Sequence, residues 1–225
     1  MEKQIEIHAY HGWGFDSTFW TPIQNRLPEH VLLKPADRGY FGGSFEPEYG
    51  VGVKRKVLFL HSYGVHWCPL EKREEVDLIV VFNGFDSFHP LKNPDKSRSK
   101  KTLKLMEKQF RQTPREVLTA FYKNCFIKNE IANPSLQWMN QSILRKDLSA
   151  LHSTKLKLSK KEKANWIIID SSNDFIVPGK RGEELSVGLN SASYEVVQSG
   201  THSLPNSNPG DCIKILTDTF PIFDR

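Results

Sequence analysis

A serine stands where an apolar, strand-like run stops. Residues 57–60 are apolar, His61 and Ser62 follow, and Gly64 lies two positions after the serine. A serine in a tight turn between a buried strand and a helix exposes its hydroxyl above the sheet, beside the unbonded N–H groups of the helix start. Ordinary core packing does not call for this arrangement, so Ser62 is the candidate nucleophile.

A serine hydroxyl needs a base to remove its proton and a third group to orient that base. The acid candidate is Asp174, in the loop after the predicted strand 166–170. Its nearest rival is Asp170, which ends that predicted strand, where a carboxylate more often caps the following turn. The base candidate is His202, on a glycine-containing loop after the strand-like run 194–197.

A fourth segment completes the set near the N-terminus. The strand-like run 5–10 leads into His11, Gly12, Trp13 and Gly14. Glycines let the backbone turn there, so the N–H of Trp13 can point at a developing oxyanion, with the N–H of Tyr63 as the second donor. We expect His11 to play a supporting hydrogen-bonding role.

Taken together, these segments resemble the α/β-hydrolase fold family over most of the chain. Residues 11–20 resemble the oxyanion segment of the pimeloyl-[acyl-carrier-protein] methyl ester esterases, which are carboxylesterases of biotin synthesis. The loops 174–178 and 200–203 resemble the acid and histidine loops of the family, and 37–42 stands where relatives carry Asp-x-x-Gly. The resemblance implies no metal or organic cofactor, and it implies a nucleophile, a general base, its orienting acid and two oxyanion-hole residues: Ser62, His202, Asp174, Trp13 and Tyr63.

The chain departs from the family pattern in three places. Leu60 replaces the first glycine of Gly-x-Ser-x-Gly and should crowd a close approach of strand and helix. Pro69 should shorten or bend the helix after the serine. Because only one strand precedes the oxyanion segment, we expect a compact, mostly parallel sheet of about six strands.

Alternating strands and helices predict an α/β fold with helices on both faces of the sheet. The elements before residue 92 are expected as strands at 4–10, 30–35, 55–61 and 77–82, a helix at about 16–27 and a short helix after Ser62. Residues 1–91 and 161–225 would form the hydrolase core. Residues 92–160, called the cap from here on, would form a basic helical insertion.

The cap differs from the core in charge. It holds 16 Lys and Arg against five Asp and Glu, whereas the rest of the chain holds 15 against 21. Leu103, Met106 and Phe110 form one helical stripe, and Thr113-Pro114-Arg115-Glu116 predicts a capping box opening a second helix. A disordered basic linker is an alternative only for 93–100.

A basic surface attracts polyanions, among which the resemblance points to an acidic acyl carrier protein. Phe121 and Trp13 would then line a tunnel for the acyl chain, although large aromatics more often belong to the core. Simple solvation of helix faces is the other interpretation of the basic residues. The cap residues expected to dock the carrier are Lys101, Lys104, Lys108, Arg111 and Arg115.

Composition fits a single globular domain in the cytoplasm. The chain has 225 residues, of which 38% are hydrophobic and 25% charged, and it begins without a basic start followed by an apolar run. We therefore expect neither a signal peptide nor a membrane partner. The three cysteines match no disulfide framework, and a zinc cluster of Cys68, His66 and His61 is less favoured than packing roles for these residues.

The expected function is hydrolysis of the methyl ester of pimeloyl-acyl-carrier protein through an acyl-enzyme on Ser62, without nucleic acid. Two rivals stay open. One is a small-molecule carboxylesterase or related hydrolase without a carrier. The other is a non-catalytic binding protein that uses the basic cap to hold nucleic acid or another acidic partner.

Overall fold

The computed structural model describes residues 5–125, 136–161, 163–177, 180–189, 192–220 and 223. Six strands form one sheet in the order β2-β1-β3-β4-β5-β6, and every neighbouring pair is parallel. This confirms the predicted parallel sheet of about six strands. The strands are β1 (Ile5–Tyr10), β2 (Val31–Pro35), β3 (Arg55–His61), β4 (Leu78–Phe82), β5 (Asn165–Asn173) and β6 (Ala192–Thr201).

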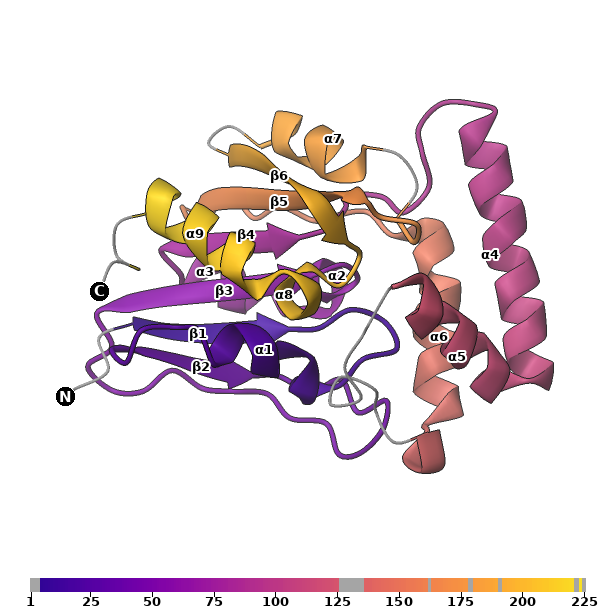
Figure 1. Cartoon of the computed structure of the whole chain (residues 1–225), viewed down its shortest axis with the longest axis horizontal. Helices are drawn as coiled ribbons and strands as arrows, with labels where there is room; N and C mark the ends of the chain where they lie inside the picture. Colours follow the sequence, from indigo (N-terminus) through magenta and orange to yellow (C-terminus); the bar gives the residue numbers. More distant parts are fainter. Residues whose placement is uncertain are drawn as a thin grey trace.

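Short helices cover both faces of the sheet (Figure 1). On one face α1 packs against α8 and α9, and on the other α2 contacts β3 while α7 contacts β5 and β6. The helices of the core are η1 (Ser17–Trp20), α1 (Thr21–Gln24), α2 (Gly64–Trp67), α3 (Leu70–Glu74), α7 (Arg181–Val187), α8 (Leu204–Ser207) and α9 (Pro209–Thr219).

The central strand β3 is buried on both sides. Val57 and Phe59 belong to the larger apolar cluster, while Leu58 and Leu60 belong to a second cluster on the opposite face. A strand buried on both faces is apolar at successive positions, which accounts for the uninterrupted run before Ser62.

Three helices of the cap stand together beside the ends of the strands, between β4 and β5 in the chain (Figure 1). They are α4 (Asp95–Gln112), α5 (Pro114–Asn124) and α6 (Gln141–Ala150), with 3-10 turns η3 (Leu136–Trp138) and η4 (Leu151–Ser153). Helix α4 already begins at Asp95, so the linker alternative is wrong for 95–100. Within the described ranges, no helix combines the length and the apolar character needed to cross a lipid bilayer.

Two local predictions differ from the structure. The helix expected at 16–27 is a 3-10 turn followed by a single turn of α-helix that ends at Gln24. The capping box at Thr113 is absent: the Thr113 side chain makes no hydrogen bond to the first turn of α5, and its hydroxyl donates to the Gln109 carbonyl in the last turn of α4. The predicted effect of Pro69 is confirmed, since this residue separates the one-turn helix α2 from α3.

The cap is fastened to the core by buried polar contacts of α6. Asp147, whose side chain is 2% exposed, accepts two hydrogen bonds from the Arg38 guanidinium at 2.8 and 3.0 Å. It also accepts one from the Tyr40 hydroxyl at 2.8 Å. The Trp13 indole N–H donates to the Leu144 carbonyl at 2.8 Å. Charge-assisted, bidentate bonds of this kind fix orientation as well as position.

Candidate active site

Ser62 follows β3 directly and has a φ of 51°, in the left-handed region that residues other than glycine rarely occupy. Its N–H donates to the Phe82 carbonyl at the end of β4, 3.0 Å away. The turn therefore lifts the serine out of the sheet at the carboxyl end of β3. Strain of this kind persists where the surrounding structure enforces it and is common at functional sites.

Gly64 makes the tight turn possible. A Cβ atom on this residue would lie 2.2 Å from the carbonyl oxygen of Tyr10, so no side chain fits between the start of α2 and the end of β1. Leu60, at the first glycine position of the motif, is fully buried in the second apolar cluster, which also contains Val65 of α2. The close approach of α2 to β1 requires the second glycine position of the motif, Gly64.

His202 and Asp174 are hydrogen-bonded to each other. The distance from His202 Nδ1 to Asp174 Oδ2 is 2.8 Å, and the side chains are 1% and 11% exposed. Asp174 Oδ1 accepts the N–H groups of Ile176 and Val177 at 2.7 and 2.9 Å, which fixes the carboxylate. Because the carboxylate only accepts, His202 carries its proton on Nδ1 and presents a lone pair on Nε2.

The rival acid Asp170 lies elsewhere. Its carboxylate accepts from the Tyr194 hydroxyl at 3.2 Å and lies against Gly182, where an added Cβ would come within 2.2 Å of it. Burial, followed by the nearby charge of Asp174, raises the pKa of Asp170 to about 7. Strand β5 continues to Asn173, so Asp170 is not at the strand end as we had expected.

His61, at the end of β3, is bonded to both the Gly12 segment and the His202 loop. From the sequence we had expected only a packing role for this residue. Its Nδ1 accepts the Gly12 N–H at 3.2 Å, and its Nε2 lies 2.9 Å from the His202 carbonyl oxygen. Since Nδ1 accepts, Nε2 carries the proton and donates to that carbonyl. Complete burial, followed by the neighbouring His202, holds the pKa of His61 well below its usual value, so the ring is neutral.

Asn83, a residue that no sequence pattern pointed to, connects three strand ends. It follows β4 with a φ of 47°. Its amide nitrogen donates to the carbonyls of Thr201 and His202 at 2.9 and 2.8 Å, and its amide oxygen accepts from the N–H and hydroxyl of Ser171. The ends of β4, β5 and β6 are thereby held in one arrangement.

The two predicted oxyanion donors lie beside Ser62. Trp13 and Tyr63 line the same cavity as the serine. Within the described ranges, neither backbone N–H donates to a protein acceptor, whereas the Gly12 N–H is taken up by His61. Two N–H groups that are not used in the fold can stabilise a developing negative charge.

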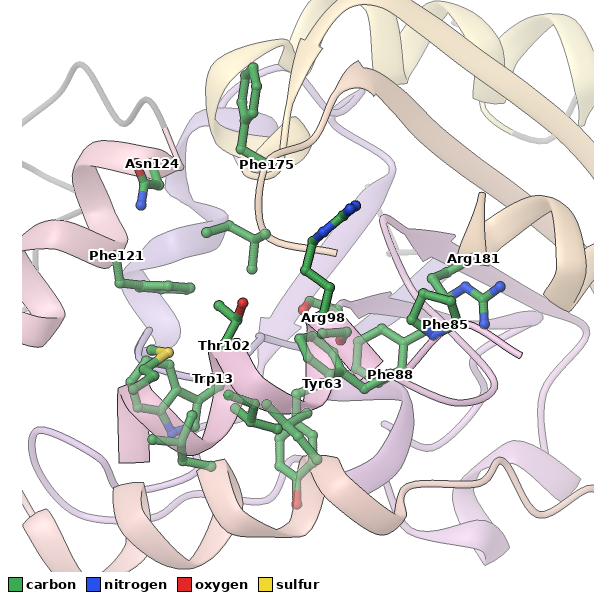
Figure 2. A pocket seen from close by; sticks show the side chains of 18 of the residues that line it. Trp13, Tyr63, Phe85, Phe88, Arg98, Thr102, Phe121, Asn124, Phe175 and Arg181 are labelled. Atoms are coloured by element: carbon green, nitrogen blue, oxygen red, sulfur yellow. The ribbon is translucent and has the colours of Figure 1, made fainter. Parts of the chain in front are cut away.

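A cavity of about 840 Å³ opens between the cap and the core (Figure 2). Ser62 is one of the residues that line it. Its inner surface is largely apolar, whereas Lys92, Arg98 and Lys180 lie among its polar lining residues. A cavity of this size holds a medium-chain acyl group or a drug-sized ligand. The apolar lining residues include Trp13, Phe85, Phe88, Leu103, Met106 and Phe121.

The remaining predicted residues lie in different places. Both aromatic residues predicted to line an acyl tunnel, Trp13 and Phe121, line the cavity, with their ring centroids 5.1 Å apart. The five predicted docking residues are exposed on α4 and α5 and do not line this cavity: Lys101, Lys104, Lys108, Arg111 and Arg115.

Solved structures share this fold. An esterase from Exiguobacterium antarcticum superimposes with a TM-score of 0.77 at 15% identity, covering 97% of this chain and 92% of its own. A thermophilic esterase from Thermogutta terrifontis superimposes with a TM-score of 0.69 at 14% identity, covering 100% of this chain and 92% of its own. An enol-lactonase from Burkholderia xenovorans LB400 superimposes with a TM-score of 0.70 at 14% identity, covering 95% of this chain and 90% of its own. No protein-family model and no curated protein matches this sequence. The chain has the α/β-hydrolase fold.

Proposed function

We propose that this protein is a serine carboxylesterase that works through an acyl-enzyme on Ser62. The observation that carries the proposal is the pairing of His202 with Asp174, on a loop that His61 and Asn83 fasten next to the strained turn of Ser62. The esterases and the lactonase of the same fold are consistent with acyl transfer.

In this mechanism His202 Nε2 takes the proton of Ser62 as the serine oxygen attacks the ester carbonyl. The N–H groups of Trp13 and Tyr63 stabilise the negative charge on the tetrahedral intermediate. Protonated His202 then gives its proton to the leaving alcohol, and a water molecule repeats the cycle to release the carboxylate. Asp174 keeps His202 in the required tautomer throughout.

For the substrate, we propose the methyl ester of pimeloyl-acyl-carrier protein, the biotin-synthesis reaction suggested by the sequence. The largely apolar cavity suits the chain of an acyl group. The exposed cations of the cap suit the acidic carrier, because none of the five has an ion-pair partner within the described residues. The thioester to the carrier would stay outside, while the methyl ester reaches Ser62.

Hydrolysis of this carrier-bound methyl ester, measured beside hydrolysis of p-nitrophenyl butyrate, tests the proposal. Turnover of both supports it in full. Turnover of only the short ester favours the small-molecule carboxylesterase, which the same cavity could serve without a carrier. Turnover of neither, together with steeply salt-dependent binding of nucleic acid, favours the non-catalytic binding protein.

Charge reversal on α4 separates carrier docking from simple solvation. We expect Lys101→Glu, Lys104→Glu and Lys108→Glu together to raise KM for the carrier-bound ester about tenfold or more and to leave p-nitrophenyl butyrate unaffected, because like charges would repel the carrier. A matched triple reversal of exposed core lysines (Lys54, Lys163 and Lys214) is the control. Equal effects of the two triples would contradict a docking role.

His61→Phe tests how the histidine loop is held. We expect kcat for p-nitrophenyl butyrate to fall about 10- to 100-fold with little change in KM, because phenylalanine keeps the buried ring but loses both hydrogen bonds, to Gly12 and to His202. His66→Phe is the control, since among the described residues that ring bonds the Phe85 carbonyl alone, 3.0 Å away. A rise in KM without loss of kcat would assign His61 to substrate binding instead.

A further inference from the structure

Four side chains outside the proposed triad form a continuous hydrogen-bonded chain. Ser99 Oγ lies 2.8 Å from His89 Nδ1, His89 Nε2 lies 3.0 Å from His152 Nδ1, and His152 Nε2 lies 3.2 Å from Glu107 Oε2. Ser99 and Glu107 lie two turns apart on α4, His89 follows β4, and His152 lies in η4. The chain therefore joins α4 to both segments that connect the cap to the core.

One arrangement of protons satisfies every hydrogen bond in this series of side chains. In it the Glu107 carboxylate accepts from His152 Nε2, and His152 Nδ1 accepts from His89. His89 must then donate from Nε2 and accept at Nδ1, which leaves Ser99 as the donor to His89. Burial, followed by His152, Lys100 and Lys96, lowers the pKa of His89 to about 4, so this ring is neutral near pH 7.

The two ends of the chain reach different openings. Ser99 lines the same cavity as Ser62, whereas Glu107 lines a separate groove of about 450 Å³ between α4 and α6. His89 between them is 6% exposed. Because Ser99 gives its proton to His89, its oxygen presents only lone pairs to the cavity.

We propose that Ser99 and the chain behind it form a proton-coupled binding site for the carboxylate of an aliphatic ligand in the cavity. When a carboxylic acid binds, its proton passes to Ser99 Oγ, the Ser99 proton passes to His89 Nδ1, and the His89 Nε2 proton passes to His152 Nδ1. The end state is a carboxylate that accepts from the Ser99 hydroxyl, and a His152 imidazolium beside the Glu107 carboxylate. One proton is added and only O–H and N–H bonds change.

The surrounding charges favour this transfer of protons only when an anion is bound. Without a ligand, the positive charges of Lys96 and Lys100 oppose an added proton on the two histidines. Arg181, which itself pairs with Glu184, donates to the His89 carbonyl at 3.1 Å. Arg98 lies next to Ser99 on the cavity wall, and Figure 2 shows it between Phe121 and Phe88. Its partner Asp95 is 63% exposed, and exposed pairs are weak, so the guanidinium can turn to a ligand carboxylate.

This inference rests on the proposed function only in that the reaction would produce such a carboxylate, and its test needs no turnover. Octanoate is titrated by calorimetry into the Ser62→Ala variant at pH 7.5, in buffers with different enthalpies of protonation. We expect uptake of about one proton per octanoate bound. Octanol, which carries no charge, should bind without proton uptake.

Substitutions in the four hydrogen-bonded side chains show which of them takes up the proton. Ser99→Ala should abolish the uptake and weaken octanoate binding about tenfold, because the carboxylate loses its hydroxyl donor. His152→Phe, which keeps an aromatic ring at this position, should also abolish the uptake. Ser97→Ala is the control, since Ser97 is an exposed serine of the same helix that bonds the Asn93 side chain and neither lines the cavity nor bonds His89. It should behave as the parent.

Two results would overturn the proposal. Proton uptake that persists in Ser99→Ala would assign the proton to another group, with His202 the first candidate. Absence of saturable octanoate binding to the folded parent would show that the cavity does not take a carboxylate. Both results are independent of whether the wild-type chain hydrolyses esters, so failure of the esterase proposal and failure of this one are distinguishable.

Discussion

Ser62→Ala is expected to reduce kcat for p-nitrophenyl butyrate by about 10⁴-fold or more, because the nucleophile of the proposed acyl-enzyme is lost. Labelling by a fluorophosphonate, which forms a covalent bond with an activated serine, should disappear as well. Initial rates and mass spectrometry of the labelled protein measure the two effects. A burst of p-nitrophenol in the wild type would show the acyl-enzyme directly.

Two further variants serve as controls for Ser62→Ala. Ser62→Gly also lacks the hydroxyl but accepts the φ of 51° without strain, so it separates loss of chemistry from loss of fold. Ser87→Ala changes a nearby loop serine outside the site and should keep wild-type activity. Labelling that survives both replacements of Ser62 would place the nucleophile on a different residue.

The second large effect is expected for Asp174→Asn, which should lower kcat by about 10³- to 10⁴-fold. The asparagine oxygen can still accept the N–H groups of Ile176 and Val177, as Asp174 Oδ1 does. The amide NH₂ then faces His202 Nδ1 and donates to it. This moves the imidazole proton to Nε2, where it blocks acceptance of the Ser62 proton.

Asp170→Asn is the matched control for this change. Its carboxylate bonds Tyr194 and not His202, and with a pKa raised by burial to about 7 it is already partly protonated near neutral pH. We expect kcat to stay within about threefold of the wild type. A larger loss in Asp170→Asn than in Asp174→Asn, measured on the same ester, would reverse the assignment of the orienting acid.

The sequence allowed the fold to be predicted because its signals were local. Strand-like runs that stop just before Ser62 and before His202 predicted strands whose carboxyl ends meet at one edge of a parallel sheet. The amphipathic pattern of Leu103 and Phe110 predicted α4, in which both are buried. Such patterns depend on a few consecutive residues and need no knowledge of what lies opposite them.

The features that sequence reasoning missed depend on residues far apart in the chain. His89 and His152 are 63 positions apart, and Arg38 and Asp147 are 109 apart, so no local pattern relates them. The capping box failed for a different reason. The Thr113 hydroxyl had two possible backbone partners, and the carbonyl at the end of α4 was the one it bonded.

The single side chain of Asn83 supports both the acid and the base of the site. Its carboxamide holds Ser171 near the acid loop with its oxygen, and the carbonyls of Thr201 and His202 with its nitrogen. Because one carboxamide bonds both strand ends, loss of Asn83 would release the acid loop and the histidine loop together. The cap takes part in the same support, since the hydroxyls of Thr201 and Ser203 donate to the Cys125 carbonyl at the end of α5. A substitution in the cap at this point would therefore reach the base as well as the substrate cavity.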